Sequence, residues 1–342
     1  DCRGLEVCGD GAIDFAAGEQ CDDGDDTDPA DGCHACALGA IADVAPQVVS
    51  GAMSCTTNTS NTGRKIASDG TANFFVVMNC GGQAWTSAST DRGTTWGAPV
   101  DTGLSGVSEV AIEGGGPLGV AYLAAVAGGR VMFVRSLDAG ATWETAQDLG
   151  AANDTEVSID ALGDQVFIAV SAGGAIDVYR NASLGAEAGW TSVSVAQSNV
   201  FHDVIVDKIS GAVVSASDDP SFHLRISTDG GATFGAESAP AGTAFFSDWT
   251  ASNGVLYVAG TSGGSDLATV IPLSAPSTSS SVSGLPVINS SQARAIDADP
   301  LGNAYVVSQL DSGEIQLDRI QVGATSVLGA DVRTFGTGTY PG

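Results

Sequence analysis

Charged residues recur at one position of a repeat of about 45 residues: Arg64, Glu109, Glu156, His202 with Asp203, Asp248 and Arg294. Two carboxylates roughly 5 to 10 Å apart are enough to hydrolyse a glycosidic bond. The candidate catalytic residues are therefore Glu109, Glu156 and Asp248, and the candidate ligand-binding residues are Arg64, His202 and Arg294. The alternative is that the carboxylates are only solvated or bind a metal, and that His202 is an ordinary hydrogen-bonded histidine.

A second group of carboxylates lies between Cys21 and Cys33. Six aspartates within ten residues repel one another strongly unless a cation binds among them, and Ca²⁺ prefers such oxygen ligands. The spacing is not that of an EF-hand, because Asp28 stands where that loop requires glycine. A solvated acidic loop explains the same residues equally well. The candidate calcium ligands are Asp10, Asp22, Asp23, Asp25, Asp26, Asp28 and Asp31.

The cysteines are confined to the first 80 residues, and five of the seven lie within the first 36. Such clustering favours a disulfide framework in an oxidising compartment over a zinc site, for which one C-x-x-C pair supplies too few ligands. With an opening that is typical of a processed chain, this predicts a secreted or cell-surface protein whose signal peptide has been removed. The expected disulfide cysteines are Cys8, Cys21, Cys33 and Cys36 within the module and Cys55 with Cys80, which leaves Cys2 either free or paired with another chain.

The fold that positions these residues can be predicted from a motif that occurs three times. The motif is S-x-D-x-G-x-T-[W/F], with aspartates at positions 91, 138 and 229. A decayed copy ends at Trp190. Six periods of about four short strands each predict an all-β, six-bladed β-propeller over residues 41–342, after a cysteine-rich module over 1–40. Either the residues near 48 or the segment from Ala324 completes the last blade. The apolar strand centres are Phe75, Ala121, Phe167, Val213, Tyr257 and Tyr305.

Each copy of the motif predicts a tight turn, here called a repeat turn (residues 89–96, 136–143 and 227–234). The glycine permits positive φ, the aspartate accepts backbone hydrogen bonds, and the aromatic residue packs between sheets. These turns resemble the Asp-box, or BNR, repeats of sialidase-like propellers, which join the third and fourth strands of a blade away from the active site. The resemblance implies a structural role for Asp91, Gly93, Trp96, Asp138, Gly140, Trp143, Asp229, Gly231 and Phe234.

Residues 8–36 resemble a cysteine-rich repeat of secreted myxobacterial proteins, with the elements C-G-[N/D]-G, G-E-x-C-D-D-G and D-G-C-x-x-C. This resemblance identifies a module of an exported protein and implies no activity. The likeness to sialidases does imply an activity, but it requires three convergent arginines, a Tyr–Glu nucleophile pair and an R-I-P motif. The chain has no R-I-P, and the repeat places only Arg64 and Arg294 at the active face.

The formal net charge of −28 disfavours binding to nucleic acids and to anionic membranes. No apolar run approaches the roughly 20 residues that cross a bilayer. We therefore expect an exported, non-catalytic protein that binds a surface glycan or protein, or itself, and acts in adhesion or in assembly into a filament or array. The alternative is a secreted carbohydrate-active hydrolase of sialidase-like fold. Trp85, Trp190 and Trp249 are candidate platforms for sugar rings, although Trp190 also fits the decayed turn.

Overall fold

The computed structural model divides the chain into two compact units, residues 1–48 and 49–342. In the first unit it describes only an antiparallel pair, β1 (Cys33–His34) and β2 (Ala37–Leu38). In the second it describes all residues except 52, 56–63, 71, 118, 153–155, 172–174, 196–200, 219–221, 241–244, 263–264, 286–293, 299–301, 310–313, 322–325, 327–332 and 338–342. The described residues form strands and turns without a helix, so none of them belongs to a helix of the length and hydropathy that crosses a membrane.

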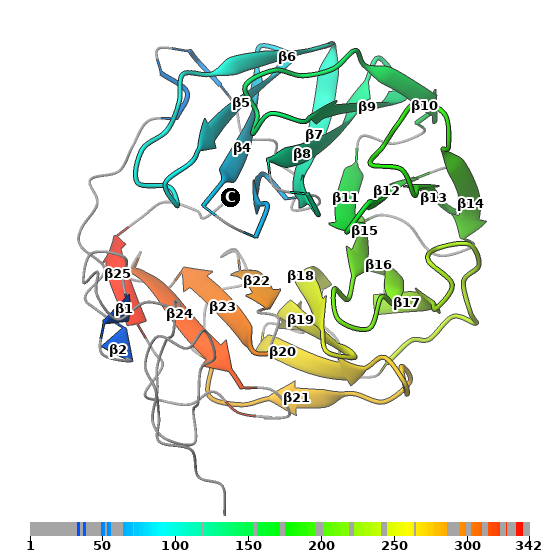
Figure 1. The fold of residues 1–342 in the computed structure, drawn as a ribbon. Helices are drawn as coiled ribbons and strands as arrows, with labels where there is room; N and C mark the ends of the chain where they lie inside the picture. Colours follow the sequence, from blue (N-terminus) through cyan, green and yellow to red (C-terminus); the bar gives the residue numbers. More distant parts are fainter. Residues whose placement is uncertain are drawn as a thin grey trace, which may run out of the picture. The chain divides into compact units, whose positions relative to one another are not determined.

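The second unit is a β-propeller whose described residues form six antiparallel sheets, numbered here sheet 1 to sheet 6 along the chain (Figure 1). Sheets 1 to 3 are β3 (Ile66–Ser68), β4 (Phe74–Cys80), β5 (Gln83–Ser89), β6 (Val100–Ser105); β7 (Val107–Gly115), β8 (Val120–Ala127), β9 (Arg130–Ser136), β10 (Gln147–Ala151); and β11 (Val157–Leu162), β12 (Gln165–Ser171), β13 (Ile176–Asn181), β14 (Thr191–Val195). Sheets 4 to 6 are β15 (Phe201–Val206), β16 (Val213–Asp218), β17 (Phe222–Ser227); β18 (Phe245–Ser252), β19 (Val255–Ser262), β20 (Ser265–Pro272), β21 (Ser280–Val282); and β22 (Arg294–Ala298), β23 (Ala304–Gln309), β24 (Glu314–Ile320), β25 (Arg333–Thr337).

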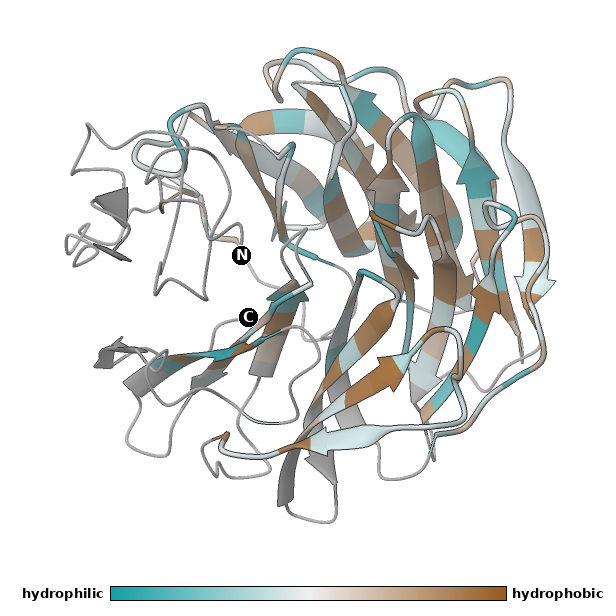
Figure 2. Cartoon of the chain, turned by 60° about the horizontal axis from the view of Figure 1, so that its bottom comes forward, coloured by the Kyte–Doolittle hydropathy of each residue, from teal (hydrophilic) through white to brown (hydrophobic). Residues whose placement is uncertain are grey.

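The sheets are arranged around a common axis, and the first strand of each lies nearest to it (Figure 1). The strands β3, β7, β11, β15, β18 and β22 contact one another in that order. The second strand of each sheet carries the predicted strand centre, which confirms the spacing argument. All the residues of β8 are buried, because sheet 2 packs against sheet 1 on one face and against sheet 3 on the other. Hydrophobic residues lie along many strands of the unit (Figure 2).

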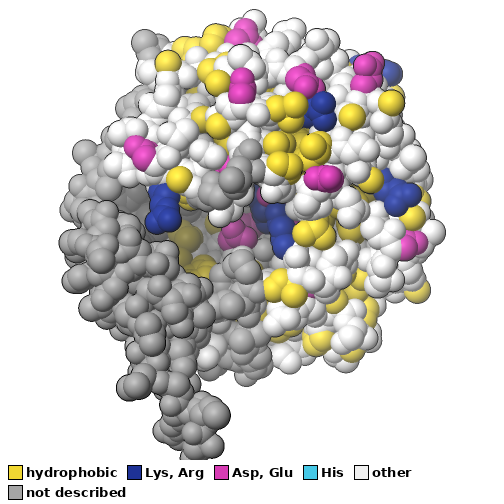
Figure 3. Space-filling model, viewed as in Figure 1, with side chains coloured by type: hydrophobic (Ala, Val, Ile, Leu, Met, Phe, Trp, Pro, Cys, Tyr) yellow, Lys and Arg dark blue, Asp and Glu magenta, His cyan; other side chains and the backbone are white. Residues whose placement is uncertain are grey.

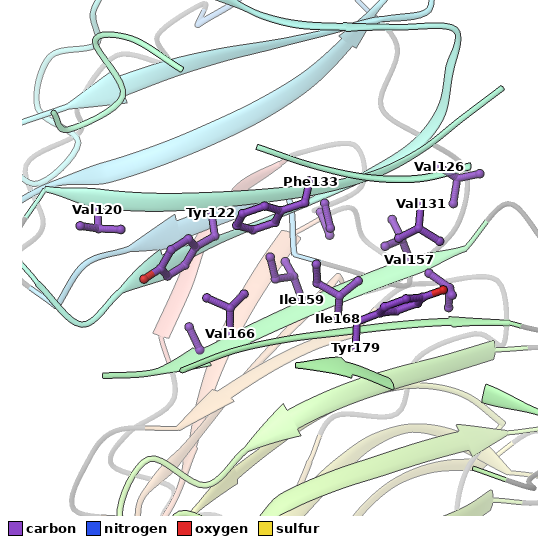
Figure 4. Close-up of a cluster of buried hydrophobic side chains, with 14 residues drawn as sticks. Val120, Tyr122, Val126, Val131, Phe133, Val157, Ile159, Val166, Ile168 and Tyr179 are labelled. Atoms are coloured by element: carbon purple, nitrogen blue, oxygen red, sulfur yellow. The ribbon is translucent and has the colours of Figure 1, made fainter. Parts of the chain in front are cut away.

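The hydrophobic core consists of separate clusters between successive sheets. Between sheets 2 and 3, Tyr122 and Phe133 stack with ring centroids 6.1 Å apart, above Ile159 and Ile168 of the next sheet (Figure 4). Trp190 of the decayed turn meets the edge of Phe133 at 4.9 Å. Burial of large apolar side chains at each interface therefore joins sheets that share no backbone hydrogen-bond ladder.

The repeat turns connect the third strand to the fourth-strand segment of sheets 1, 2 and 4. In sheet 2, Ser136 Oγ accepts a hydrogen bond from the Gly140 N–H (2.9 Å) and donates one to Asp138 Oδ1 (2.8 Å). Asp138 in turn accepts the N–H and the hydroxyl of Thr142, at 2.8 and 2.6 Å. Residue for residue, the turns of sheets 1 and 4 repeat these bonds.

The decayed turn of sheet 3 keeps the backbone of a repeat turn with other side chains. Asn181 Oδ1 replaces the serine hydroxyl and accepts the N–H groups of Ser183 (2.7 Å) and Gly185 (3.1 Å). Leu184 and Gly185 have φ of 54° and 70°, matching the left-handed pair Ala139 and Gly140. A Cβ on Gly185 would lie 2.4 Å from the Phe133 ring, so glycine is required there for conformation and for space.

Two connections at the ends of the propeller unit are settled by the structure. The C-terminal strand β25 pairs antiparallel with β24, so the segment after Ala324 supplies the fourth strand of sheet 6. The predicted disulfide between Cys55 and Cys80 is confirmed, with a Cα–Cα distance of 4.0 Å, and it ties the segment before β3 to the end of β4.

Candidate functional site

The inner strands carry a group of charged side chains around the axis of the propeller. We call it the channel cluster, and its members are Arg64, Glu113, Asp160, Asp203, Lys208, Asp248 and Asp297. They come from all six sheets, from β7, β11, β15, β18 and β22 and from the residues next to β3 and β15. In the view of Figure 3, Lys or Arg side chains lie beside Asp or Glu side chains in the hollow at the middle of the molecule's visible face.

Two cations hold the buried carboxylates of sheets 2 and 3. Lys208 Nζ lies 2.9 Å from Glu113 Oε1 and 2.9 Å from Asp160 Oδ1. Arg64 Nη1 donates to Glu113 Oε2 at 2.9 Å, and Arg64 Nη2 lies 3.9 Å from Asp297 Oδ1. The side chains of Glu113 and Asp160 are 4% and 2% exposed, whereas those of Arg64 and Lys208 are 33% and 42% exposed. Two partly exposed cations therefore join buried carboxylates across sheets 1 to 4.

Backbone hydrogen bonds hold two carboxylates of the cluster, Asp248 and Asp160. Asp248 accepts the N–H of Ile296 in the next sheet at 2.9 Å and the N–H of Trp249 at 3.0 Å. Asp160 accepts the N–H of Val206, also in the next sheet, at 2.7 Å. Each carboxylate therefore extends the contact between two inner strands that form no ladder with one another.

The cluster contains carboxyl groups whose ionisation is disfavoured. Burial raises the pKa of Asp203 to about 7, opposed by a hydrogen bond from Ser158 and by the charge of Arg64. Burial likewise raises the pKa of Asp248 to about 6, opposed by the Ile296 N–H and by Arg64. Burial disfavours the Arg64 guanidinium too, but Glu113, Asp160 and Asp297 outweigh it and hold its pKa well above the ordinary value. Arg64 thus stays charged, while Asp203 and Asp248 titrate close to neutral pH.

Burial and neighbouring charges shift the pKa values of Lys208, Asp160 and Glu113 with different net results. Burial disfavours the Lys208 ammonium, but Asp160 and Glu113 raise its pKa above the ordinary value. For Asp160 the two cations and the Val206 N–H overcome burial and lower the pKa. For Glu113 burial prevails over Lys208 and Arg64, and the pKa is raised. Asp160 is therefore held as a carboxylate, whereas burial disfavours the ionised form of Glu113 despite the same cation.

The structure separates the three candidate catalytic carboxylates. Asp248 belongs to the channel cluster, whereas Glu109 on β7 pairs with Lys65 at 2.7 Å. Glu156 lies next to β11, with Oε2 at 3.7 Å from His202 Nδ1. Glu109 and Glu156 are 3% and 7% exposed, and His202 is completely buried. Each of the two glutamates thus faces a basic residue of the protein.

The remaining predicted residues are placed as follows. Arg64 lies in the channel cluster, and the side chain of Arg294 lies outside the described residues. Trp249 is 3% exposed and packs at 5.4 Å against Phe222, so the expectation that it is a sugar platform is wrong. Outside the described residues lie all candidate calcium ligands and the side chains of Cys2, Cys8, Cys21, Cys33 and Cys36. In the described part of the chain, no three His, Cys, Asp or Glu residues are arranged to hold a metal ion.

Sequence reasoning missed Glu113, Asp160, Lys208 and Asp297, because it looked for functional residues only where each inner strand begins. These four lie toward the other end of the inner strands, near the turn to the second strand. A signal was available in the sequence. Glu113 and Asp160 are 47 residues apart, and each is a carboxylate within an apolar strand, which requires a buried partner.

No protein-family model matches the chain, and no curated protein matches its sequence. Among solved structures, the NanB sialidase of Streptococcus pneumoniae, bound to 2-[(3-chlorobenzyl)ammonio]ethanesulfonate, is similar with a TM-score of 0.51 and 10% identity, over 77% of this chain and 67% of the sialidase chain. A prolyl endopeptidase is similar with a TM-score of 0.51 and 12% identity, over 77% of this chain and 40% of the other. At such identities the likeness concerns the fold, which is a sialidase-like β-propeller.

Proposed function

We propose that the chain is an exported, non-catalytic binding protein that acts in surface adhesion or in assembly into an extracellular filament or array. The observation that carries this proposal is that four carboxylates of the inner strands already have partners within the protein. Glu113 and Asp160 share Lys208, Glu109 pairs with Lys65, and Asp248 accepts two backbone N–H groups. Carboxylates that have such partners hold sheets together, and few carboxyl groups are then left to catalyse the hydrolysis of a sugar.

For the N-terminal module, the proposal is based on the sequence alone. Its acidic loop binds Ca²⁺, and Cys2 or the loaded loop contacts a second copy of the chain or another surface component. Three properties support this role: the cysteine framework, the six aspartates between Cys21 and Cys33, and the net charge of −28, which attracts divalent cations. Interpreting the repeat turns as structural Asp-boxes agrees with a non-catalytic role as well, because the hydrogen bonds of each turn are made within that turn.

A hydrolase is the second candidate, and one observation favours it. Asp203 and Asp248, with pKa values of about 7 and 6, lie close enough to Arg64 for its charge to act on both. A carboxyl group that keeps its proton near neutral pH suits a general acid, as glycosidic bond cleavage requires. In this reading Asp203 donates the proton to the leaving oxygen, and Asp248 acts as the second carboxylate.

Product analysis separates the two functions. The purified full chain is incubated with fluorogenic glycosides of neutral sugars and of N-acetylneuraminic acid, in parallel with the Asp203→Asn and Asp248→Asn variants. The binding function predicts no product from any of the three proteins. Product that forms with the native chain and is lost in both variants would establish the hydrolase and overturn our proposal.

Electron microscopy of the non-reduced protein, with Ca²⁺ and then with EGTA, tests whether the chain assembles. Ordered polymers that dissociate in EGTA, or that are missing in the Cys2→Ser variant, are the expected result. Single particles in every condition would exclude assembly and leave adhesion as the binding function.

A further inference from the structure

Outside the channel, a cavity of about 560 Å³ lies at the edge of sheet 2, where the turn of sheet 3 meets it. Its volume falls in the range of about 300–1,000 Å³ that is typical of ligand sites. Most of its lining is polar, with one large aromatic residue. The lining side chains that matter here are Arg135, Trp143, Glu144, Thr145, Gln147 and Glu187.

Hydrogen bonds between the two sheets hold the wall of the cavity in place. Arg135 Nη1 donates to the Leu184 carbonyl at 2.6 Å, and Gln147 Nε2 donates to the Gly185 carbonyl at 2.9 Å. Trp143 Nε1 is anchored on Thr86 Oγ1 of sheet 1 at 2.9 Å, which fixes the plane of the indole. The cavity is therefore preorganised, so a ligand does not have to order these side chains.

The decayed turn of sheet 3 differs from the other turns at the residue that lines the cavity. Thr95, Thr142 and Thr233 occupy one position in the three repeat turns, and each donates its hydroxyl to the aspartate of its own turn. Glu187 stands at that position in sheet 3, and Ser183 replaces the aspartate. The turn has lost its internal carboxylate and gained an exposed one directed to the cavity.

We infer that this cavity binds a neutral saccharide unit, an inference that rests on the proposed binding function and names its ligand class. Glu187 and Glu144 accept hydrogen bonds from vicinal hydroxyls, Arg135 and Thr145 donate to hydroxyl oxygens, and the indole of Trp143 contacts the apolar face of the ring. Arg135 is paired with Glu144 at 2.7 Å, so the lining carries net negative charge and disfavours an acidic sugar. The guanidinium within the lining disfavours a simple ammonium ligand.

Calorimetric titration of the full chain with D-galactose, D-mannose, L-fucose and N-acetyl-D-glucosamine tests the inference, with N-acetylneuraminic acid as the acidic comparison. We expect at least one neutral sugar to bind and the acidic sugar not to bind. Glu187→Thr, which installs the residue of the other turns, should weaken binding by about tenfold, because it removes hydrogen bonds to a charged acceptor. Trp143→Phe, matching Phe234 at the same position of sheet 4, should weaken it by about threefold.

Two variants serve as matched controls. Trp96→Phe makes the same change in the repeat turn of sheet 1, and Glu237→Gln removes an exposed carboxylate from sheet 4; both should leave affinity unchanged. Absence of binding by all four neutral sugars, or binding that neither Glu187→Thr nor Trp143→Phe weakens, would overturn the inference. In the second case the proposed binding function would stand, with its site elsewhere. Cleavage of oligosaccharides would instead overturn the proposed function, whatever the two cavity variants did.

Discussion

Aspartates in two regions of this propeller have opposite electrostatic properties. In the repeat turns at its edge, hydrogen bonds from threonine lower the pKa of Asp91, Asp138 and Asp229, although all three lie near solvent. In the channel, burial raises the pKa of Asp203 and Asp248, although Arg64 is near. Burial therefore decides the direction of the pKa shift for Asp203 and Asp248, whereas hydrogen bonds to the ionised form decide it for the turn aspartates.

The comparison also teaches what each region contributes to stability. The turn aspartates stabilise the fold as anions above their ordinary pKa, and this contribution is lost as the pH falls through the lowered folded value. Asp203 and Asp248 bind protons more tightly in the folded state than in the unfolded chain. Their effect therefore favours folding at low pH and diminishes as the pH rises through about 6 to 7.

The largest expected effect comes from removing the channel cation. Lys208→Met leaves Glu113 and Asp160 without their shared ammonium, and the free energy of unfolding at pH 7.5 should fall by about 2–3 kcal/mol. At pH 5 the loss should be smaller, because the carboxyls can take up protons. Urea denaturation measures both values. Arg130→Met breaks an exposed pair with Asp148 and should cost clearly less stability. Equal losses in the two variants would contradict a stabilising role of Lys208 toward the buried Glu113 and Asp160.

Neutralising a channel aspartate should stabilise the protein, in contrast to most substitutions of buried polar groups. Asp203→Asn keeps the shape and can still accept from Ser158, but it removes a charge that burial opposes. We expect no gain at pH 4 and a gain of about 1–3 kcal/mol at pH 8, since the folded pKa of about 7 lies above the ordinary value. A series of urea titrations from pH 4 to 8 tests this. A gain that is independent of pH would argue against the raised pKa of Asp203.

The same substitution in a repeat turn should have the opposite sign. Asp138→Asn cannot accept both bonds from Thr142 and the bond from Ser136, so it should destabilise the protein by about 1 kcal/mol at pH 7. The deficit should begin to shrink as the pH falls below the ordinary aspartate pKa of about 3.9, and it should vanish only below the lowered pKa of the folded state. Thermal unfolding at pH 3 and pH 7 measures it. Ser183→Asn, at the equivalent position of sheet 3, is the control and should change little. A deficit of the same size at pH 3 and pH 7 would contradict the lowered pKa of Asp138, because the unfolded chain takes up protons in this range.

The smallest effect concerns the decayed turn itself. The double variant Ser183→Asp with Glu187→Thr restores the aspartate–threonine pair and should add about 0.5 kcal/mol. Ser183→Asp alone should add nothing, because Glu187 then faces a like charge four residues away. Differential scanning calorimetry of the three proteins is sensitive enough. A single variant as stable as the double would mean that the pair does not account for the turn's stability.

The fold could be read from the sequence because its signals are local and repeated. The turn motif, the apolar strand centres and the spacing of about 45 residues each depend on a few neighbouring positions, and Phe75, Phe167 and Tyr257 lie where the spacing placed them. The sequence left open which segment completes the last sheet, because both segments have the apolar pattern of an outer strand. Only the pairing of β25 with β24 distinguishes them.

The candidate site was predicted less well because its contacts are not local. Arg64 and Asp248 were predicted from the sequence. Lys208 and Glu113, however, are 95 residues apart in the sequence, and no pattern in either segment predicts their contact. His202 and Glu156 were assigned to an open channel mouth, whereas the packing of sheets 3 and 4 buries both of them. Strand periodicity tells which residues point to the axis; how much water remains there depends on how closely the sheets approach one another.

Every sheet in the described part of the propeller pairs only strands that follow one another in sequence, and this bears on how the molecule is made. Each sheet can complete its hydrogen-bond ladders from a short stretch of newly synthesised chain, before the next stretch leaves the ribosome. A finished sheet would then offer its apolar face as a template for its successor, which favours growth around the ring in one direction. Errors of assembly should accordingly concentrate at the junctions between sheets rather than within them.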